Sequence, residues 1–287
     1  MQNILVTGSN GQLGNEIRVI APNYQSCNFI FTDVDELDIC NRKAVVSFFE
    51  HQKIDFLINC AAYTAVAKAE EDAETAYLIN CTAVQNLAEI ANKFGCKMIH
   101  VSTDYVFDGK NYLPYTEEMP IQPQSVYGKT KAEGEAVLQK ATDNAIILRT
   151  SWLYSSFGNN FVKTMLRLGA ERESVSVIFD QIGTPTYAAD LALAILEIIV
   201  SGKFEAGIYH YSDEGVCSWY DFAIAIFKLS KITCQVNPIE AKDFYDKTPR
   251  PFYSVLNKAK IKTVYGLSIP HWEESLEQCL VVIKKGA

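Results

Sequence analysis

The chain has 287 residues, 48% of them hydrophobic, and a formal net charge of −8 at pH 7. This length supports a sizeable core, either as one large domain or as two coupled ones. The acidic balance and the lack of a basic cluster argue against a nucleic-acid binder. The longest apolar stretch, Leu191 to Val200, is too short to span a bilayer.

The eight cysteines include no Cys-x-x-Cys pair, and several lie inside apolar runs. We expect them to be reduced core residues rather than a disulfide framework. The chain enters a strand almost at once, with no cationic segment and cleavage site before it. These features favour a cytoplasmic protein that is not attached to a membrane.

The first 150 residues alternate short apolar runs with helical patterns. The apolar runs, which predict buried parallel strands, are Ile4–Thr7, Phe29–Thr32, Phe56–Cys60, Met98–Ser102 and Ile146–Thr150. The segments that predict helices between them are Gln12–Ile20, Arg42–His51, Ala73–Phe94 and Lys129–Ala141. This alternation predicts an α/β fold with a Rossmann-type, doubly wound parallel sheet.

After residue 150 the chain becomes rich in turns. Further helices are predicted at Phe161–Ala170, Ala188–Ser201, Ser218–Leu229 and Trp272–Lys285. We expect residues 1–150 to form a dinucleotide-binding domain. Residues 151–287 are expected to form a smaller substrate-binding α/β region that partly returns to the main sheet. Ligands of open α/β sheets bind at the carboxyl ends of the strands, so this region is expected to cover that edge.

The segment between the first predicted strand and the first helix is Gly8-Ser9-Asn10-Gly11-Gln12-Leu13-Gly14. Its spacing is typical of a loop that binds the pyrophosphate of a dinucleotide. Gly8 permits a tight turn, Gly11 lets the backbone approach the phosphates, and Gly14 lets helix and strand pack closely. The helix then offers free N–H groups to the phosphate charge. The alternative is a glycine-rich turn without a ligand.

An acidic residue, Asp33, follows the second predicted strand. A carboxylate there can bond a ribose 2′-hydroxyl and repels a 2′-phosphate, which favours NADH. Arg18 would offset that repulsion if it reaches the same corner, so NADPH remains open. Asp38 and Ile39 are expected near the adenine, with a helix cap as the alternative role of Asp38.

Small residues follow the third predicted strand. Ala62 and Tyr63 would let the cofactor lie against the backbone, and Thr64 could contact its ribose or phosphates. Asn80 lies in the next predicted helix. It is either a support for an active-site lysine or an ordinary helical asparagine.

Tyr127 and Lys131 are one helical turn apart, so their side chains face the same way. Tyr127 would donate a proton to the oxygen of a ketone that receives a hydride. The ammonium of Lys131 would lower the phenol pKa and hold the nicotinamide ribose. Thr103, after the fourth strand, would bond the same oxygen. The alternative is a Tyr-x-x-x-Lys pair that occurs by chance. The glycine loop earlier in the chain makes this alternative less favoured.

The four histidines show no ligand spacing with one another or with a cysteine. His100 is expected to be a buried strand residue. A catalytic metal site is therefore not supported by the sequence.

The glycine loop, the segment Ser102–Phe107 and the Tyr-x-x-x-Lys pair resemble the extended short-chain dehydrogenase/reductase superfamily. More narrowly, the chain resembles the dTDP-4-dehydrorhamnose reductase family, almost from end to end. That resemblance rests on further segments, which are Gly11–Gly14, Asn59–Val66, Arg149–Tyr154, Gly158–Phe161, Asp180–Thr186 and Arg250–Leu256. Dehydratases of the superfamily typically carry an acid where this chain has Tyr105.

The resemblance implies NAD(P)H-dependent reduction of the C4 ketone of dTDP-4-dehydro-L-rhamnose to dTDP-L-rhamnose. It implies Tyr127 as the proton donor, Lys131 as its partner and ribose ligand, and Thr103 as the hydroxyl at the substrate oxygen. The substrate-contact positions that it implies are Ser102, Thr103, Asp104, Trp152, Asn160, Arg250 and Ser254. The guanidinium of Arg250 suits a diphosphate; a surface arginine before a proline is its alternative.

The chain departs from the family pattern at two places. Tyr63 stands where the family commonly has His, and the loop around Thr248–Pro251 is expected to be shorter than in many relatives. Some relatives bind Mg²⁺ through acids at a dimer interface, and Glu16 aligns with one of them. Mg²⁺ and a homodimer are thus expectations from the resemblance, beside the alternative that Glu16 is an exposed helical residue.

Two other functions remain open. A sugar-nucleotide epimerase of this fold would carry tightly bound NAD⁺. A non-catalytic regulatory subunit, like the relative that binds a methionine adenosyltransferase, would not require Thr103, Tyr127 and Lys131 together.

Overall fold

A six-stranded parallel sheet, in the order β10-β5-β4-β3-β1-β2, is the centre of the structure. Its strands are β1 (Gln2–Thr7), β2 (Cys27–Thr32), β3 (Phe56–Asn59), β4 (Lys97–Thr103), β5 (Ala145–Thr150) and β10 (Gly207–His210). The structure is a computed structural model that describes residues 1–246 and 248–286. The five strands predicted in the first half, and the doubly wound sheet that they form, are confirmed.

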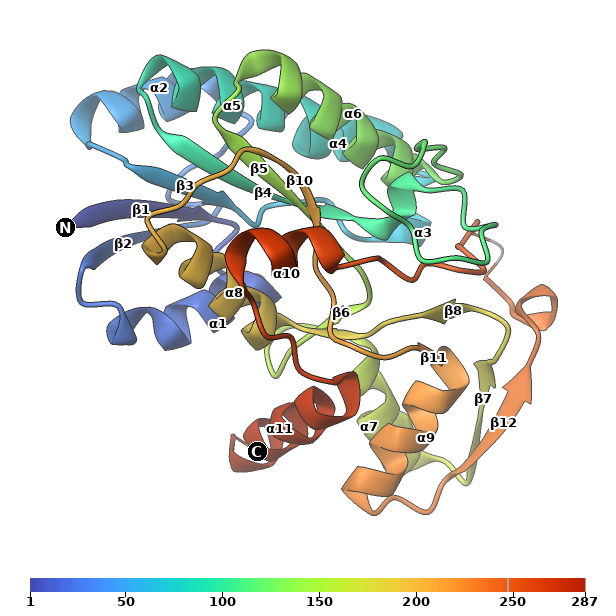
Figure 1. The fold of residues 1–287 in the computed structure, drawn as a ribbon. Helices are drawn as coiled ribbons and strands as arrows, with labels where there is room; N and C mark the ends of the chain where they lie inside the picture. The colour runs from blue at the N-terminus through green and yellow to red at the C-terminus, as the bar shows by residue number, and fades with distance from the viewer. Residues whose placement is uncertain (247, 287) are drawn as a thin grey trace.

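Helices cover both faces of this sheet (Figure 1). One face packs against α2 (Arg42–His51), α5 (Ala83–Lys93) and α6 (Val126–Ala141), and the opposite face against α1 (Gln12–Ile20) and α8 (Ala188–Val200). Two apolar layers therefore sandwich the strands, which explains why their sequences read as continuous hydrophobic runs. Since β2 and β3 lie on opposite sides of β1, the order in which strands are added to the sheet reverses at β1. Open α/β sheets bind ligands at such a reversal.

The prediction of one continuous helix at Ala73–Phe94 is wrong. The structure divides it into α4 (Ala73–Tyr77), a π-helical turn at Leu78–Thr82, and α5. A side chain at Gly134 of α6 would clash with the carbonyl oxygen of Asn80, so the π turn lies directly against α6. Such turns often occur at functional sites, and here the turn directs Asn80 into the interior.

The second half of the chain contributes to both parts of the molecule. Its α8, β10 and the segment around Ile261 pack with the main sheet, and most of the remainder forms a second apolar core beyond the carboxyl ends of the strands (Figure 1). The elements of this outer part are β6 (Leu153–Tyr154), α7 (Phe161–Glu171), β7 (Ser174–Ile178), β8 (Ile182–Gly183), β9 (Thr186–Tyr187), β11 (Cys217–Ser218), α9 (Trp219–Ser230), β12 (Gln235–Ile239) and α11 (Trp272–Lys285). The helices predicted in this half are confirmed, whereas its short strands and α10 (Ala259–Tyr265) were not predicted.

Side-chain caps begin the helices that border the carboxyl edge of the sheet. Ser125 accepts a hydrogen bond from the backbone of Gly128 at the start of α6, and Asn160 accepts one from Lys163 at the start of α7. Asn41 caps α2. The cap that we allowed as an alternative for Asp38 is therefore wrong.

All eight cysteines are free. Within residues 1–246 and 248–286, no helix combines the length and the apolar character that crossing a membrane requires.

Candidate active site

The glycine loop and the end of β3 approach each other closely at the point where the sheet changes direction. Gly8 has a positive φ of 64°, and a Cβ there would lie 2.6 Å from the Cα of Ala61. A Cβ at Gly14 would lie 2.5 Å from the Cα of Ser9, so helix and strand pack as closely as predicted. Only glycine fits at these two positions, and the loop leaves its backbone open to a ligand.

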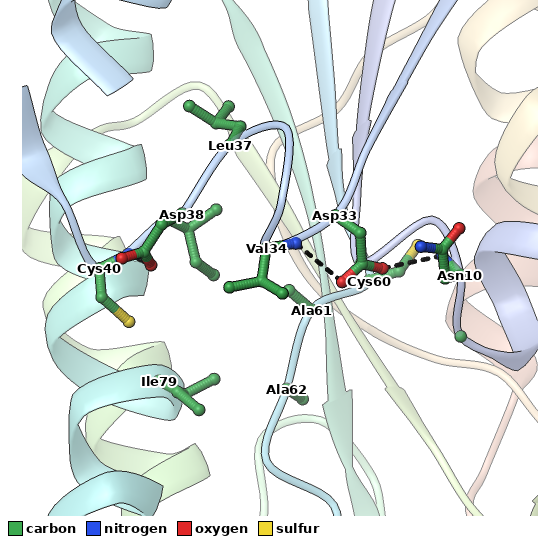
Figure 2. Close-up of a pocket in the computed structure, with 13 residues that line it drawn as sticks. Asn10, Asp33, Val34, Leu37, Asp38, Cys40, Cys60, Ala61, Ala62 and Ile79 are labelled. Carbon is green, nitrogen blue, oxygen red and sulfur yellow. Dashed lines mark hydrogen bonds between the residues drawn. The ribbon is translucent and has the colours of Figure 1, made fainter. Parts of the chain in front are cut away.

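The first pocket, of about 440 Å³, lies beside this loop, and we call it the glycine-loop pocket (Figure 2). Asp33 stands at its edge and accepts hydrogen bonds from the backbone N–H groups of Asn10 and Val34, both at 2.9 Å. Asp38 and Ile39 line the same pocket, as predicted for the adenine region. Among the described residues that line it, none is basic.

Arg18 lies behind the loop rather than in the glycine-loop pocket. It donates a hydrogen bond to the hydroxyl of Ser9 at 3.0 Å, and its guanidinium covers the ring of Phe31 at 4.5 Å. The guanidinium of Arg18, whose positive charge could offset that of Asp33, is thus held by Ser9 and Phe31.

A second pocket, of about 550 Å³, continues the first, because Gly8, Gly11, Cys60 and Ala62 line both; we call it the central cleft. It gathers most of the predicted cofactor, catalytic and substrate residues. These are Gly8, Gly11, Gln12, Leu13, Ala62, Thr64, Ser102, Thr103, Asp104, Tyr127, Lys131, Trp152, Asn160 and Arg250. Together the two pockets form one groove over the carboxyl ends of β1, β3 and β4.

Thr103 and Tyr127 face each other in the central cleft. Burial raises the pKa of Tyr127 above its usual value, and a hydrogen bond with Thr103 opposes that rise. The ring of Tyr105 packs edge-on against Tyr127, with 5.4 Å between centroids. Burial also raises the pKa of Asp104 to about 6, although Thr103 donates to its carboxylate at 3.0 Å. The floor of the cleft, where Thr103 and Asp104 are buried, therefore holds weakly acidic groups.

Lys131 points to the backbone of β4. Its Nζ donates to the carbonyl oxygen of Val101 at 2.7 Å and lies 3.2 Å from Nε2 of His100. Burial lowers the pKa of Lys131 to about 8, and the charge of Glu135 opposes the shift. The lowering of the Tyr127 pKa by Lys131 stays a prediction, because burial of the phenol raises that pKa in this structure.

A buried ion pair fixes α6, which carries Tyr127 and Lys131, to the sheet. Arg149 of β5 donates three hydrogen bonds to Glu135 of α6, the shortest at 2.7 Å, and both side chains are 2% exposed. Ser102 donates to the same carboxylate. Ser102 borders the cleft while its hydroxyl bonds Glu135, so its contact with substrate stays a prediction. Glu135 follows Lys131 by four residues, a spacing that could have revealed it.

The family model for the RmlD substrate binding domain matches residues 1–284. This chain belongs to that family. The dTDP-4-dehydrorhamnose reductase of Aggregatibacter actinomycetemcomitans is 42% identical to it, over 96% of this chain and 98% of the relative.

Two solved structures of RmlD relatives agree with the fold. The crystal structure of a dTDP-4-dehydrorhamnose reductase from Clostridium acetobutylicum has a TM-score of 0.95 and 43% identity, and covers 99% of this chain and 100% of that one. The enzyme of the same name from Bacillus anthracis, in complex with NADP, has a TM-score of 0.94 and 38% identity, and covers 98% and 99%. The fold therefore agrees with the RmlD family along the whole chain.

Two predicted contact residues of this RmlD member lie outside the central cleft. Tyr63 does not line it: Asn80 bonds both its backbone N–H and its carbonyl, and its hydroxyl donates to Asp72. Ser254 is buried beneath the cleft and bonds Asp104. Asn80 also donates to Thr130 of α6 at 3.1 Å. It is thus no ordinary helical residue, since it ties the loop after β3 to the helix that carries Tyr127.

The metal expectation does not fit the residues present. Glu16 is 4% exposed and accepts a 2.6 Å hydrogen bond from Ser155, so the alternative of an exposed glutamate is wrong. Burial raises the pKa of Glu16, which disfavours the charged form that a metal needs. In the described part of the chain, no group of three or more His, Cys, Asp or Glu could hold a metal.

A third pocket, of about 1010 Å³, adjoins the central cleft at Trp219 and Arg250, and we call it the outer pocket. Trp152 stacks on Trp219 at this junction, with 3.5 Å between ring centroids and 8° between planes. Trp152 has a φ of 47°, a strained conformation for a bulky residue, such as is found at functional sites. Arg250 donates to Asp246 at 2.8 Å and keeps part of its guanidinium open.

Proposed function

We propose that the protein reduces the C4 ketone of dTDP-4-dehydro-L-rhamnose to dTDP-L-rhamnose with NADH or NADPH. One observation carries the proposal: Thr103, Tyr127 and Lys131 converge in a cleft that is continuous with the glycine-loop pocket. The relatives described above are named for this activity. The match to the family model extends along nearly the whole chain.

The groove suits an extended dinucleotide. Its glycine-loop pocket takes the adenosine end, with Asp33 at the ribose, and the loop and α1 N-terminus face the pyrophosphate. The central cleft, which Tyr127 and Lys131 line, would hold the nicotinamide end. When bound, the reduced cofactor supplies the hydride that adds to the carbonyl carbon.

The side chains of the cleft supply the proton. Tyr127 donates its phenolic proton to the carbonyl oxygen as the hydride arrives, so the ketone becomes an alcohol and the phenol a phenolate. Thr103 holds that oxygen by a hydrogen bond. The positive form of Lys131 favours the phenolate, because opposite charges stabilise each other in a buried site.

The sugar nucleotide extends from the central cleft into the outer pocket. The sugar lies beside Thr103 and Tyr127, the diphosphate beside Arg250, and the thymidine in the outer pocket. The junction supports this path, because Trp219 and Arg250 line both cavities. Asn160 at the start of α7 adds a helix N-terminus, which favours an anion there.

The test is the absorbance of reduced nicotinamide, with dTDP-4-dehydro-L-rhamnose generated in situ and NADH or NADPH supplied separately. Oxidation that needs both protein and sugar nucleotide is the expected result. Folded protein that binds dinucleotide but oxidises neither cofactor would contradict the proposed substrate. Purified protein that already holds NAD⁺ would favour an epimerase instead.

We predict that Asp33 sets a preference for NADH over NADPH. Two carboxylates and no base line the glycine-loop pocket among its described residues, so a 2′-phosphate meets only negative charge there. Asp33→Ser is expected to raise the NADPH/NADH ratio of kcat/KM by about tenfold, the effect of one charge contact of about 1.4 kcal/mol. Asp35→Ser is the matched control, since Asp35 is exposed and does not line the pocket. A wild-type protein that prefers NADPH would contradict this charge argument.

We predict that Arg250→Met raises KM for the sugar nucleotide by about tenfold to a hundredfold, because charge-assisted hydrogen bonds to phosphate contribute about 1.5–3 kcal/mol. The KM for NADH should stay nearly constant. Arg42→Met is the control: this arginine also has one carboxylate partner, Glu89, but lies on the surface of α2. Steady-state kinetics with each substrate varied in turn separates the cases, and equal changes in both KM values would contradict the assignment.

We further propose that the protein is cytoplasmic and forms a homodimer. Eight free cysteines, with the Cys60 pKa raised to about 12 by burial, suit a reducing cytoplasm. A homodimer is proposed from the family resemblance. Light scattering of the purified chain measures its state.

A further inference from the structure

A line of buried polar side chains runs beneath the central cleft, from the centre of the sheet to Lys131. Thr7, Asn59 and His100 are neighbours in register on β1, β3 and β4, and all are at most 1% exposed. Thr7 bonds Asn59 at 2.8 Å, Asn59 bonds His100 at 3.0 Å, and His100 meets Lys131 at 3.2 Å. A buried polar line of this kind is costly unless each member is satisfied.

The direction of these hydrogen bonds is set at Asn59. Its Oδ1 accepts from the backbone N–H of Ala61 at 3.2 Å and from the hydroxyl of Thr7, so its Nδ2 faces His100. Because Nδ2 only donates, Nδ1 of His100 must accept. The neutral imidazole then carries its proton on Nε2, which is the atom that faces Lys131.

The opposite arrangement leaves a clash of two donors. An ammonium at Lys131 that donates to Nε2 needs the ring proton on Nδ1, only 3.0 Å from the Nδ2 donor of Asn59. A doubly protonated ring does not relieve this clash, and burial together with the charge of Lys131 lowers the pKa of His100 well below its usual value. The facing atoms of Asn59, His100 and Lys131 pair as donor and acceptor only when Nε2–H donates to an uncharged amine, which itself donates to Val101.

We propose that His100, oriented by Asn59 and Thr7, is a positioning residue that donates a hydrogen bond to Nζ of Lys131 and makes this lysine a proton-exchanging amine instead of a permanent cation. The inference rests on the proposed role of Lys131 as partner of Tyr127. It extends that role, because the charge of Lys131 then depends on a histidine that touches neither substrate nor cofactor.

The other groups around Lys131 fit this role. Burial lowers its pKa to about 8, and Glu135, one turn further along α6, opposes the shift. Arg149 holds Glu135 with three hydrogen bonds, so the negative charge near Lys131 is largely matched. From β4 the facing groups are His100 and the Val101 carbonyl, and from α6 they are Tyr127 and Glu135.

The first test measures the histidine itself and needs no activity. Protein labelled with ¹⁵N-histidine gives two-bond ¹H–¹⁵N correlations, and only four histidines contribute. The signal lost in His100→Gln identifies His100. At pH 9, above the Lys131 pKa of about 8, we expect a neutral ring with the proton on Nε2. A ring protonated on Nδ1 overturns the proposal, whether or not the proposed substrate is correct.

The second test is the pH profile of kcat/KM for His100→Gln, measured in the direction of ketone reduction. A glutamine offers a carbonyl oxygen to Lys131, so the ammonium form gains an acceptor and its pKa rises. The alkaline limb, where loss of that positive charge slows the reaction, should move up by about one pH unit. An unchanged limb overturns the proposal.

The matched control is His210→Gln. His210 is also fully buried, and its Nδ1 bonds a backbone carbonyl, that of Tyr115, but it does not line the central cleft. The control should lose stability as His100→Gln does, without moving the limb. Equal shifts in both variants would mean that loss of any buried histidine is the cause, which contradicts the proposal.

Discussion

Replacing Tyr127 with Phe is expected to lower kcat by about 10²–10⁴-fold while the protein still binds reduced dinucleotide. The phenolic proton is the one that reaches the substrate oxygen in the proposed reaction. Phe keeps the ring that packs against Tyr105 at 5.4 Å, so the cleft should retain its shape. Stopped-flow hydride transfer measures the rate, and quenching or enhancement of nicotinamide fluorescence measures binding.

The control for this variant is Tyr209→Phe. Tyr209 is 2% exposed on β10, and its hydroxyl donates to the carbonyl of Glu205, far from the substrate groups. It should lose a hydrogen bond without losing turnover. If Tyr127→Phe keeps full activity, Tyr127 is not the proton donor. If the protein instead binds and regulates another enzyme, and neither variant changes that regulation, the alternative of a non-catalytic regulatory subunit gains support.

Replacing Arg149 with Met should destabilise the fold by about 3–5 kcal/mol, because it leaves the carboxylate of Glu135 buried without its partner. Both side chains are only 2% exposed, so solvent cannot take over the role of the guanidinium. Ser102 alone would then remain as a donor to the carboxylate. Chemical denaturation followed by circular dichroism measures the change.

The double variant Arg149→Met with Glu135→Leu tests the reason for that loss. An apolar pair of similar size removes the unpaired charge, so most of the lost stability should return. If the double variant is as unstable as the single one, the loss comes from packing around Arg149 and not from the buried charge. The surface pair of Arg167 and Glu171 gives the comparison, since breaking an exposed pair costs only about 0–1 kcal/mol.

The half of the groove at the glycine loop could largely be predicted from the sequence, because its signals are local. Gly8 and Gly14 lie at close contacts with Ala61 and Ser9, where a side chain would clash. Asp33 follows β2, and its carboxylate holds the loop at Asn10. Such residues are set by the backbone of one strand–turn–helix unit, so spacing along the chain is enough to find them.

The substrate half could be predicted only in part. Arg250 and Trp152 line the central cleft as the family resemblance implied, but Trp219 was missed. Its place comes from stacking on Trp152, a contact across 67 positions (219 − 152 = 67) that no local pattern encodes. The bond of Ser102 to Glu135 was also not predicted, and it arises because α6 packs against β4 at that point.

The class of fold, the glycine loop and the Tyr127–Lys131 pair can be predicted from the sequence alone, because each depends on residues within one element or one turn. The surroundings of Lys131 depend on the tertiary structure. His100 reads as an ordinary buried strand residue, yet its neighbours in register on β1 and β3 orient its proton toward the lysine. Hydrogen-bond direction and burial depend on which strands lie side by side, and that order arises when the sheet assembles.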